Sequence, residues 1–166
     1  MTFDPRCARC REGGHGQFYT YDSGDGRVWH FDVGLAMRLA LAHPGTLGLV
    51  AVADLLGHAG RNAVDAAHVH HVDETLPLLA VTLEVGGSPF GILIDGNHRL
   101  RKLAALGVPD AQVYLLTREL TESVITLGPD GPRSGLGLMI QRLGETATAR
   151  VTQDPPGGQD REAGRA

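Results

Sequence analysis

The chain has 166 residues, which is enough for one domain with a sizeable core and leaves little for a second. Hydrophobic residues make up 42% and charged residues 20%, as in an ordinary soluble globular protein. The formal net charge of −4 disfavours a protein that binds duplex DNA through its overall field. No apolar run reaches the length of a membrane span, and the N-terminus lacks the pattern of a secretory signal. We therefore expect a cytoplasmic protein with no membrane partner.

An N-terminal β-hairpin is the first predicted element. Two short, aromatic-rich runs over 17–21 and 27–31 are separated by a loop that contains Asp25-Gly26. An Asp-Gly pair favours the positive φ angles of a tight hairpin turn. The hairpin precedes the predicted core and extends it.

A helix, a strand and two short helices follow. Asp32 suits the N-cap of a helix over 33–42, which His43-Pro44-Gly45 ends. Leu35, Leu39 and Ala42 of this helix fall on one face, with Ala36 and Ala40 beside them. The next predicted elements are a strand over 47–52 and short helices near 54–58 and 64–67.

Strands and helices alternate in the second half of the chain. Residues 90–94 are mostly apolar on both faces, as in a strand that is buried on both sides. Residues 97–106 have helical periodicity, with Leu100, Leu103 and Ala104 on the buried side. The remaining predicted elements are strands over 78–84 and 111–116 and a helix from Thr117 or Arg118 to about Leu127.

Together these elements predict an α/β or α+β fold with a small mixed sheet, packed helices and an N-terminal β-hairpin extension. We divide the chain into an arm and hairpin over 1–31, a core over 32–128, and a tail over 129–166. The tail is rich in Gly and Pro and then polar, so we expect it to be partly disordered.

The turn Asp95-Gly96-Asn97-His98-Arg99 is the most informative segment for function. Gly96 permits a tight turn and a close approach of a ligand to the backbone. The helix that follows at once begins with amides that lack intrahelical partners, and these amides and the helix dipole attract anions. Arg99 adds a planar guanidinium that matches phosphate. We therefore predict an anion site suited to phosphate, with five candidate contacts: Gly96, Asn97, His98, Arg99 and Arg101.

Two side chains of this turn also suit catalysis. His98 can move a proton or stabilise developing charge, and Asp95 can hold a ribose hydroxyl, a metal ion or an incoming hydroxyl nucleophile. The alternative is a plain strand-to-helix junction in which Asp95 or Asn97 caps the helix. In that alternative Arg99, Arg101 and Lys102 form only a solvated helix face.

The segment from His68 to Glu74, His-Val-His-His-Val-Asp-Glu, is the densest set of candidate metal ligands. On a strand, His68 and His70 would share one face and His71 and Asp73 the other, so neither face supplies three ligands alone. The alternative is a polar loop or strand edge. If the segment folds beside the turn, Asp73 and Glu74 are the candidates for a magnesium ligand or a catalytic base.

Two further pairs of residues have open interpretations. Cys7 and Cys10 have the spacing of a zinc knuckle, which His15 and the more distant His30 would complete, or they are free thiols on an exposed arm. Arg61-Asn62 either reaches a ligand or belongs to a solvated loop.

The sequence from Ile94 to Arg99 resembles the (Ile/Val)-Asp-Gly-x-His-Arg signature of the ParB/sulfiredoxin superfamily, in which a strand ends in this turn before a helix and another strand. The likeness covers about residues 76–120 and is weak over 45–75. It implies a ParB/sulfiredoxin-like fold. It also implies that the turn binds the phosphates of a nucleotide such as ATP, ADP or CTP, with Mg²⁺.

Three branches of the superfamily differ in what they imply for this chain. Sulfiredoxins have a cysteine where this chain has Asn97, so their repair activity is not implied. Chromosome-partition proteins bind CTP through a Gly-x-x-Arg turn, which Gly96 and Arg99 match, but no helix-turn-helix follows here. Small kinases that phosphorylate free serine have turns close to Asp-Gly-His-His-Arg, and the turn here is nearest to theirs.

The resemblance implies a nucleotide-binding protein, and most concretely a phosphotransferase or nucleotide hydrolase that acts with a small hydroxyl compound as acceptor. In this interpretation Asp95, His98 and Glu74 are the candidate catalytic residues. One alternative is a non-catalytic, nucleotide-responsive regulator or DNA-associated module, although the acidic pI disfavours DNA. A further alternative is a nuclease, but no clear cluster of carboxylates for two metal ions is evident.

Overall fold

The computed structural model of the chain describes residues 17–59, 62, 64–85 and 87–133. These residues form a mixed α+β fold with two small sheets. Three predictions lie outside the described residues: the zinc ligands Cys7, Cys10 and His15, the role of Arg61, and the tail beyond residue 133. In the described part of the chain, no helix is both long enough and apolar enough to cross a membrane.

The central sheet contains four strands in the order β3 (Leu47–Ala51), β6 (Asp110–Leu116), β4 (Leu78–Val85) and β5 (Ser88–Asp95). β4 runs parallel to β6 and antiparallel to β5, and β3 runs antiparallel to β6. This arrangement confirms the predicted mixed sheet. The run of apolar residues in β4 and β5 is explained by burial of both faces of the sheet.

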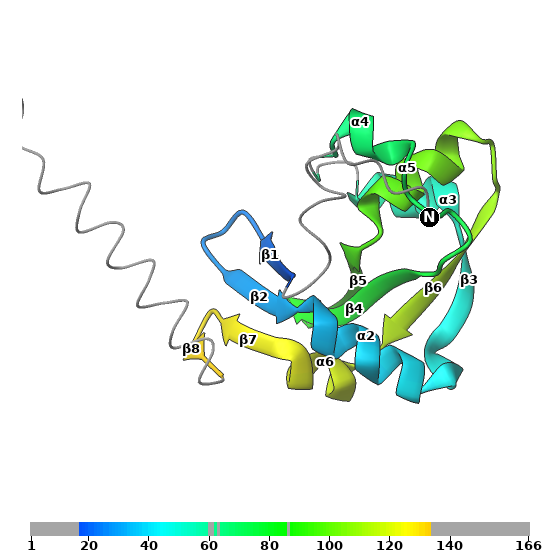
Figure 1. Ribbon diagram of the computed structural model, residues 1–166. Coiled ribbons are helices and arrows are strands. Elements are labelled where there is room, and N and C mark those ends of the chain that lie inside the picture. Colours follow the sequence, from blue (N-terminus) through cyan, green and yellow to red (C-terminus); the bar gives the residue numbers. More distant parts are fainter. Residues whose placement is uncertain (1–16, 60–61, 63, 86, 134–166) are drawn as a thin grey trace, which may run out of the picture.

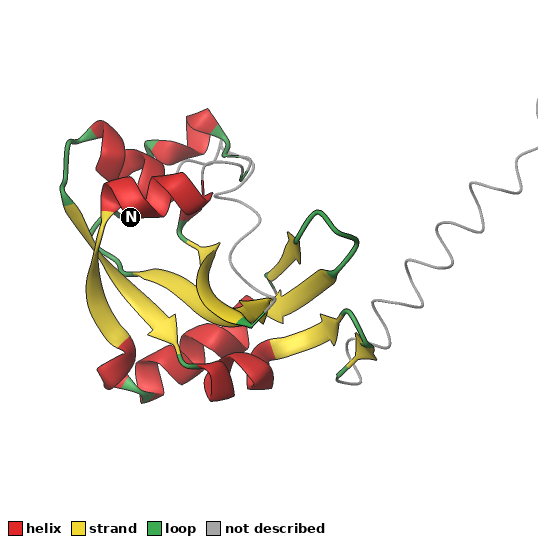
Figure 2. Cartoon of the chain, turned by 180° about the vertical axis from the view of Figure 1, so that it is seen from behind, coloured by secondary structure: helices red, strands yellow, loops and turns green. Residues whose placement is uncertain are grey.

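Side chains alternate between two cores along β4. Leu79, Val81 and Leu83 contribute to one cluster, which includes residues of α2 (Val33–Ala42) and α6 (Arg118–Val124). Leu78 and Ala80 contribute to the other cluster, which includes residues of α3 (Val52–Ala59) and α5 (Asn97–Ala105). The sheet is therefore covered by helices on both faces, and Figures 1 and 2 show these two layers from opposite sides.

The second sheet joins the predicted hairpin to the rest of the molecule. Its strands, in order, are β1 (Phe18–Asp22), β2 (Val28–Asp32), β7 (Ile125–Gly128) and β8 (Gly131–Pro132). β1 and β2 pair antiparallel, as predicted, and β2 also pairs with β7. Trp29 and Phe31 are buried in the same cluster as Leu79. The hairpin thus shares a core with the central sheet.

One element differs clearly from its prediction. The helix predicted to run from about residue 118 to Leu127 ends at Val124, and the next residues form β7. In α2 the buried residues are Val33, Ala36 and Ala40, while Leu35 and Leu39 are only partly buried against the core and Ala42 is exposed. The His-rich segment, for which strand and loop were both open, begins in a short helix, α4 (Ala66–Val69), and continues in turns.

The start of α2 follows its prediction closely. The Asp32 carboxylate accepts a hydrogen bond of 2.8 Å from the amide of Leu35, as an N-cap does. After α2, a 3₁₀ turn, η1 (Pro44–Thr46), leads into β3.

Candidate functional site

The junction between β5 and α5 is built around Gly96. This residue has a φ of +95°, a conformation that residues with a Cβ rarely adopt. A Cβ added here would also lie 2.6 Å from the Leu78 side chain, which is fully buried. Gly96 therefore lets the chain turn sharply from a buried strand into a helix against the core.

No side chain caps the first turn of α5, because the N-cap residue is a glycine. Gly96 is the N-cap and makes no side-chain cap hydrogen bond. The first intrahelical hydrogen bond joins the Leu100 amide to the Gly96 carbonyl at 2.8 Å. The amides of Asn97, His98 and Arg99 precede that bond, so the helix itself does not use them. They form the kind of terminus at which anions bind.

A cavity of about 190 Å³, here named the turn cavity, lies beside this helix terminus. The turn contributes Asp95, Gly96, His98 and Arg99, and the segment that follows α4 contributes Asp73. Gln17 and His68 also line it. The His-rich segment thus folds beside the turn, which was the condition for assigning a role to Asp73.

Arg99 and Asp95, at the two ends of the turn, form an ion pair with each other. Their side chains meet at 2.7 Å, and the Arg99 side chain is only 12% exposed. The guanidinium lies over Gly96, within 3.2 Å of the position that a Cβ would occupy there. Arg99 is therefore held against the helix terminus, with its charge partly balanced by Asp95.

A backbone contact orients the ring of His98. Its Nε2 accepts a hydrogen bond of 3.1 Å from the Asp65 amide, which leaves Nδ1 as the nitrogen that can donate. The His68 ring packs edge-on against it, with centroids 4.9 Å apart. These contacts fix the imidazole beside the turn cavity.

The two acidic candidates from the His-rich segment differ in position. Asp73 lines the turn cavity, and hydrogen bonds from Thr75 lower the pKa of its carboxyl group. Glu74 instead forms an ion pair of 2.6 Å with Lys102, whose ammonium lowers the pKa of Glu74. Lys102 also donates to the Val72 carbonyl at 2.8 Å. These two contacts of Lys102 therefore hold the His-rich segment against α5.

Arg101 lies apart from the other predicted phosphate contacts. It lines a separate shallow hollow with Asn62, Val64, Ala66 and Val69. The turn cavity therefore brings together five of the predicted residues, Asp73, Asp95, Gly96, His98 and Arg99. The side chains of Asn97, Glu74 and Arg101 are not among those that line it.

The sequence did not decide whether Asn62 reaches a ligand or belongs to a solvated loop, and the structure gives its contacts. Its side chain donates to Asn97 Oδ1 at 2.8 Å and accepts from the Tyr19 hydroxyl at 2.9 Å. The hairpin is thereby joined to the first residue of α5. No local pattern marks Tyr19 as part of the site, because it is 43 residues from Asn62 in the chain.

Metal binding stays a prediction. Among the described residues, no three His, Cys, Asp or Glu side chains form a group that could hold a metal ion. His30, the distant candidate for the zinc set, has its Nδ1 within 3.0 Å of the Thr20 hydroxyl. Asp73 and Asp95 both line the turn cavity, so a magnesium ion bound with phosphate would meet carboxylates there.

Comparison with known proteins gives no further assignment: no family model, curated protein or solved structure matches the chain.

Replacing Gly96 tests whether the turn depends on a residue without a side chain. We expect Gly96→Ala to lower the free energy of unfolding more than Gly107→Ala does. Gly107 has a φ of +70° with no atom near the added Cβ, so its substitution should cost only about 1–2 kcal/mol of backbone strain. At Gly96 the contact with Leu78 adds to that strain. Urea denaturation of both variants measures the difference, and equal losses would contradict the close contact.

Proposed function

We propose that this chain is a nucleotide-binding protein of ParB/sulfiredoxin type that holds nucleotide phosphates at the start of α5. The most concrete form of the proposal is transfer of a phosphoryl group to a small hydroxyl compound. The observation that supports it most is the convergence of an uncapped helix terminus, the Arg99 guanidinium and the Asp73 carboxylate on one cavity. The resemblance of residues 94–99 to the superfamily signature adds to this support.

Each residue of the turn has a definite task in the proposal. The first-turn amides of α5 and the Arg99 guanidinium hold phosphate oxygens. The His98 ring can donate a proton from Nδ1 to developing charge. Asp95 and Asp73 lie on the same cavity and can orient magnesium or the acceptor hydroxyl. Magnesium, when bound, would neutralise charge on the phosphates.

A nucleotide-responsive regulator without catalysis is the second candidate. The observation that favours it is the ion pair between Arg99 and Asp95. In this pair the guanidinium that would hold phosphate already contacts the carboxylate that would orient the metal or the acceptor. An arriving phosphate would compete with Asp95 for the guanidinium. Replacement of Asp95 by phosphate would change the conformation of the turn. The hydrogen bonds from Asn97 to Asn62 and from Asn62 to Tyr19 could pass that change on to the hairpin.

Nucleotide binding should raise the melting temperature of the wild-type chain and depend on Arg99. A ligand at a hundred times its dissociation constant stabilises the fold by about 2.7 kcal/mol. Loss of a hydrogen bond to a charged group costs about 1.5–3 kcal/mol, so Arg99→Ala should weaken binding by roughly 10- to 150-fold. A thermal-shift screen of ATP, ADP, CTP and GTP, with and without magnesium, measures both effects.

Arg99→Lys is the matched control, because it keeps the charge but loses the planar fork, and it should retain part of the shift. Absence of a shift with every nucleotide would refute nucleotide binding. Phosphotransfer that persists in Arg99→Ala would refute the catalytic form of the proposal alone.

Asp95→Asn should separate phosphate binding from catalysis. The substitution removes a carboxylate that lies 2.7 Å from the Arg99 guanidinium, so inorganic tripolyphosphate should bind several-fold more tightly. Phosphoryl transfer should fall, since Asp95 no longer orients the metal or acceptor. Calorimetric titration measures the affinity. Asp54→Asn on α3 makes the same charge change on a residue that does not line the turn cavity, and an equal gain there would show a mere effect of net charge.

A further inference from the structure

A second cavity, here named the strand cavity, has a volume of about 330 Å³ and lies between β1 and β5. β1 is the end strand of one sheet and β5 the end strand of the other in the described part of the chain. Tyr19 and Tyr21 line the cavity from β1, and Phe90 and Ile92 line it from β5. The volume is within the range of small-molecule sites.

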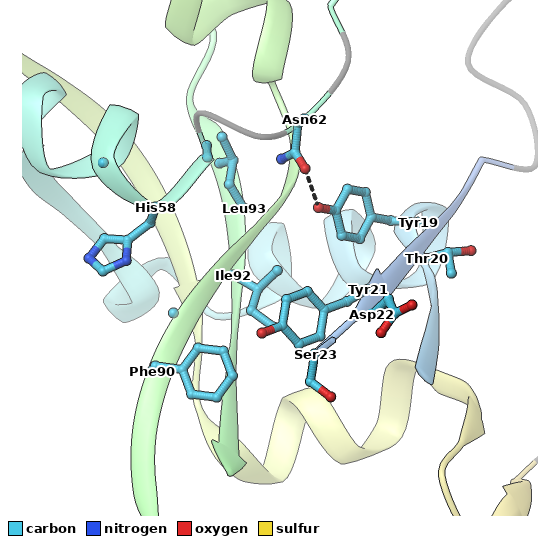
Figure 3. A pocket seen from close by; sticks show the side chains of 13 residues that line it. Tyr19, Thr20, Tyr21, Asp22, Ser23, His58, Asn62, Phe90, Ile92 and Leu93 are labelled. Carbon is cyan, nitrogen blue, oxygen red and sulfur yellow. Dashed lines mark hydrogen bonds between the residues drawn. The ribbon is translucent and has the colours of Figure 1, made fainter. Parts of the chain in front are cut away.

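The wall of the strand cavity combines aromatic rings with amide and hydroxyl groups. The rings of Tyr21 and Phe90 are 5.9 Å apart and only partly buried. Figure 3 shows them beside each other, with the Tyr19 hydroxyl turned to Asn62 nearby. Aromatic faces bind planar ring systems by stacking, and amide and hydroxyl groups add hydrogen bonds. This wall fits a nucleoside better than a small aliphatic compound.

The two cavities follow one another along the same pair of strands. Tyr19 to Ser23 of the hairpin line the strand cavity, and Gln17, just before β1, lines the turn cavity. On the facing strand, β5 passes from Phe90 and Ile92 to Asp95 at the turn. Phe90 and Asp95 are about 17 Å apart along an extended strand, so a ligand that reaches both ends must be long, as an extended nucleoside triphosphate is.

Asn62 links the wall of the strand cavity to the start of α5. Its amide group accepts a hydrogen bond from Tyr19, which lines the strand cavity, and donates one to Asn97, the first residue of α5. Burial raises the pKa of the Tyr19 hydroxyl. This side of the strand cavity is therefore held to the helix that carries the proposed phosphate contacts.

We propose that the strand cavity is the nucleoside subsite of the anion site, with the base against Tyr21 and Phe90 and the phosphates at the start of α5. This inference rests on the proposed nucleotide binding and adds the place of the base. The hairpin, which supplies Tyr19 and Tyr21, precedes the stretch of chain that resembles the superfamily, so the resemblance does not imply this wall of the subsite.

Calorimetric titration with ATP, CTP, GTP and inorganic tripolyphosphate, each with magnesium, tests the proposal. At least one nucleotide should bind wild type more tightly than tripolyphosphate does. Tyr21→Ala should weaken that nucleotide by roughly 5- to 100-fold and leave tripolyphosphate unchanged. Arg99→Ala should weaken both ligands.

A second variant guards against loss of folding in Tyr21→Ala. Gly57 lies in α3 at the wall of the strand cavity, and a Cβ added there meets no atom within 4 Å. Gly57→Leu should therefore fold and obstruct the cavity, while Gly57→Ala is the matched control that is too small to do so. Nucleotide affinity should fall in the first variant and remain in the second.

The outcomes distinguish the two proposals. Suppose that tripolyphosphate binds as tightly as every nucleotide, and that the Tyr21 and Gly57 variants bind nucleotide with unchanged affinity. The strand cavity is then not a nucleoside subsite, and only the proposed phosphate site is supported. If neither tripolyphosphate nor any nucleotide binds wild type, the proposed function fails, and the nucleoside subsite fails with it.

Discussion

The backbone conformation of Gly96 is the constraint on which the candidate site depends. The sharp turn from β5 into α5 uses a positive φ at Gly96, and the space beside that residue is filled by Leu78. Leu78 belongs to β4, the strand that contributes to both cores. The position of the helix terminus is therefore set by the packing of the central sheet, and the backbone of the proposed anion site lies against the core.

Polar contacts then tie the elements around the turn to one another. Arg99 pairs with Asp95, Lys102 pairs with Glu74, and Asn62 connects Tyr19 with Asn97. None of these four pairs joins adjacent residues, and three of them reach across more than 25 residues. They bring the hairpin and the His-rich segment to the same end of β5. A ligand at the turn would thus contact parts of the chain that the turn motif itself does not include.

Local pattern was enough to predict the hairpin, the Asp32 cap and the position of α5, because each depends on neighbours in the chain. The mixed sheet followed from the order of the predicted strands and helices. It was not enough for β7, whose residues were assigned to a helix. The β-branched residues around Ile125 favour a strand, but the deciding contact is pairing with β2, almost 100 residues away. In α2 nearly every residue is apolar, so periodicity did not single out a face. The small Ala36 and Ala40 allow close packing there.

The most direct test of the account is an NMR titration of the ¹⁵N-labelled chain with ATP, CTP or GTP and magnesium. We predict that the largest changes in amide chemical shift occur at Gly96 to Arg99 and extend along β1 to Tyr21, while the exposed strand β3 at the far edge of the sheet is unaffected. Shifts that leave Gly96 to Arg99 unchanged, whether they appear elsewhere or nowhere, would contradict the assignment of this turn as the phosphate site.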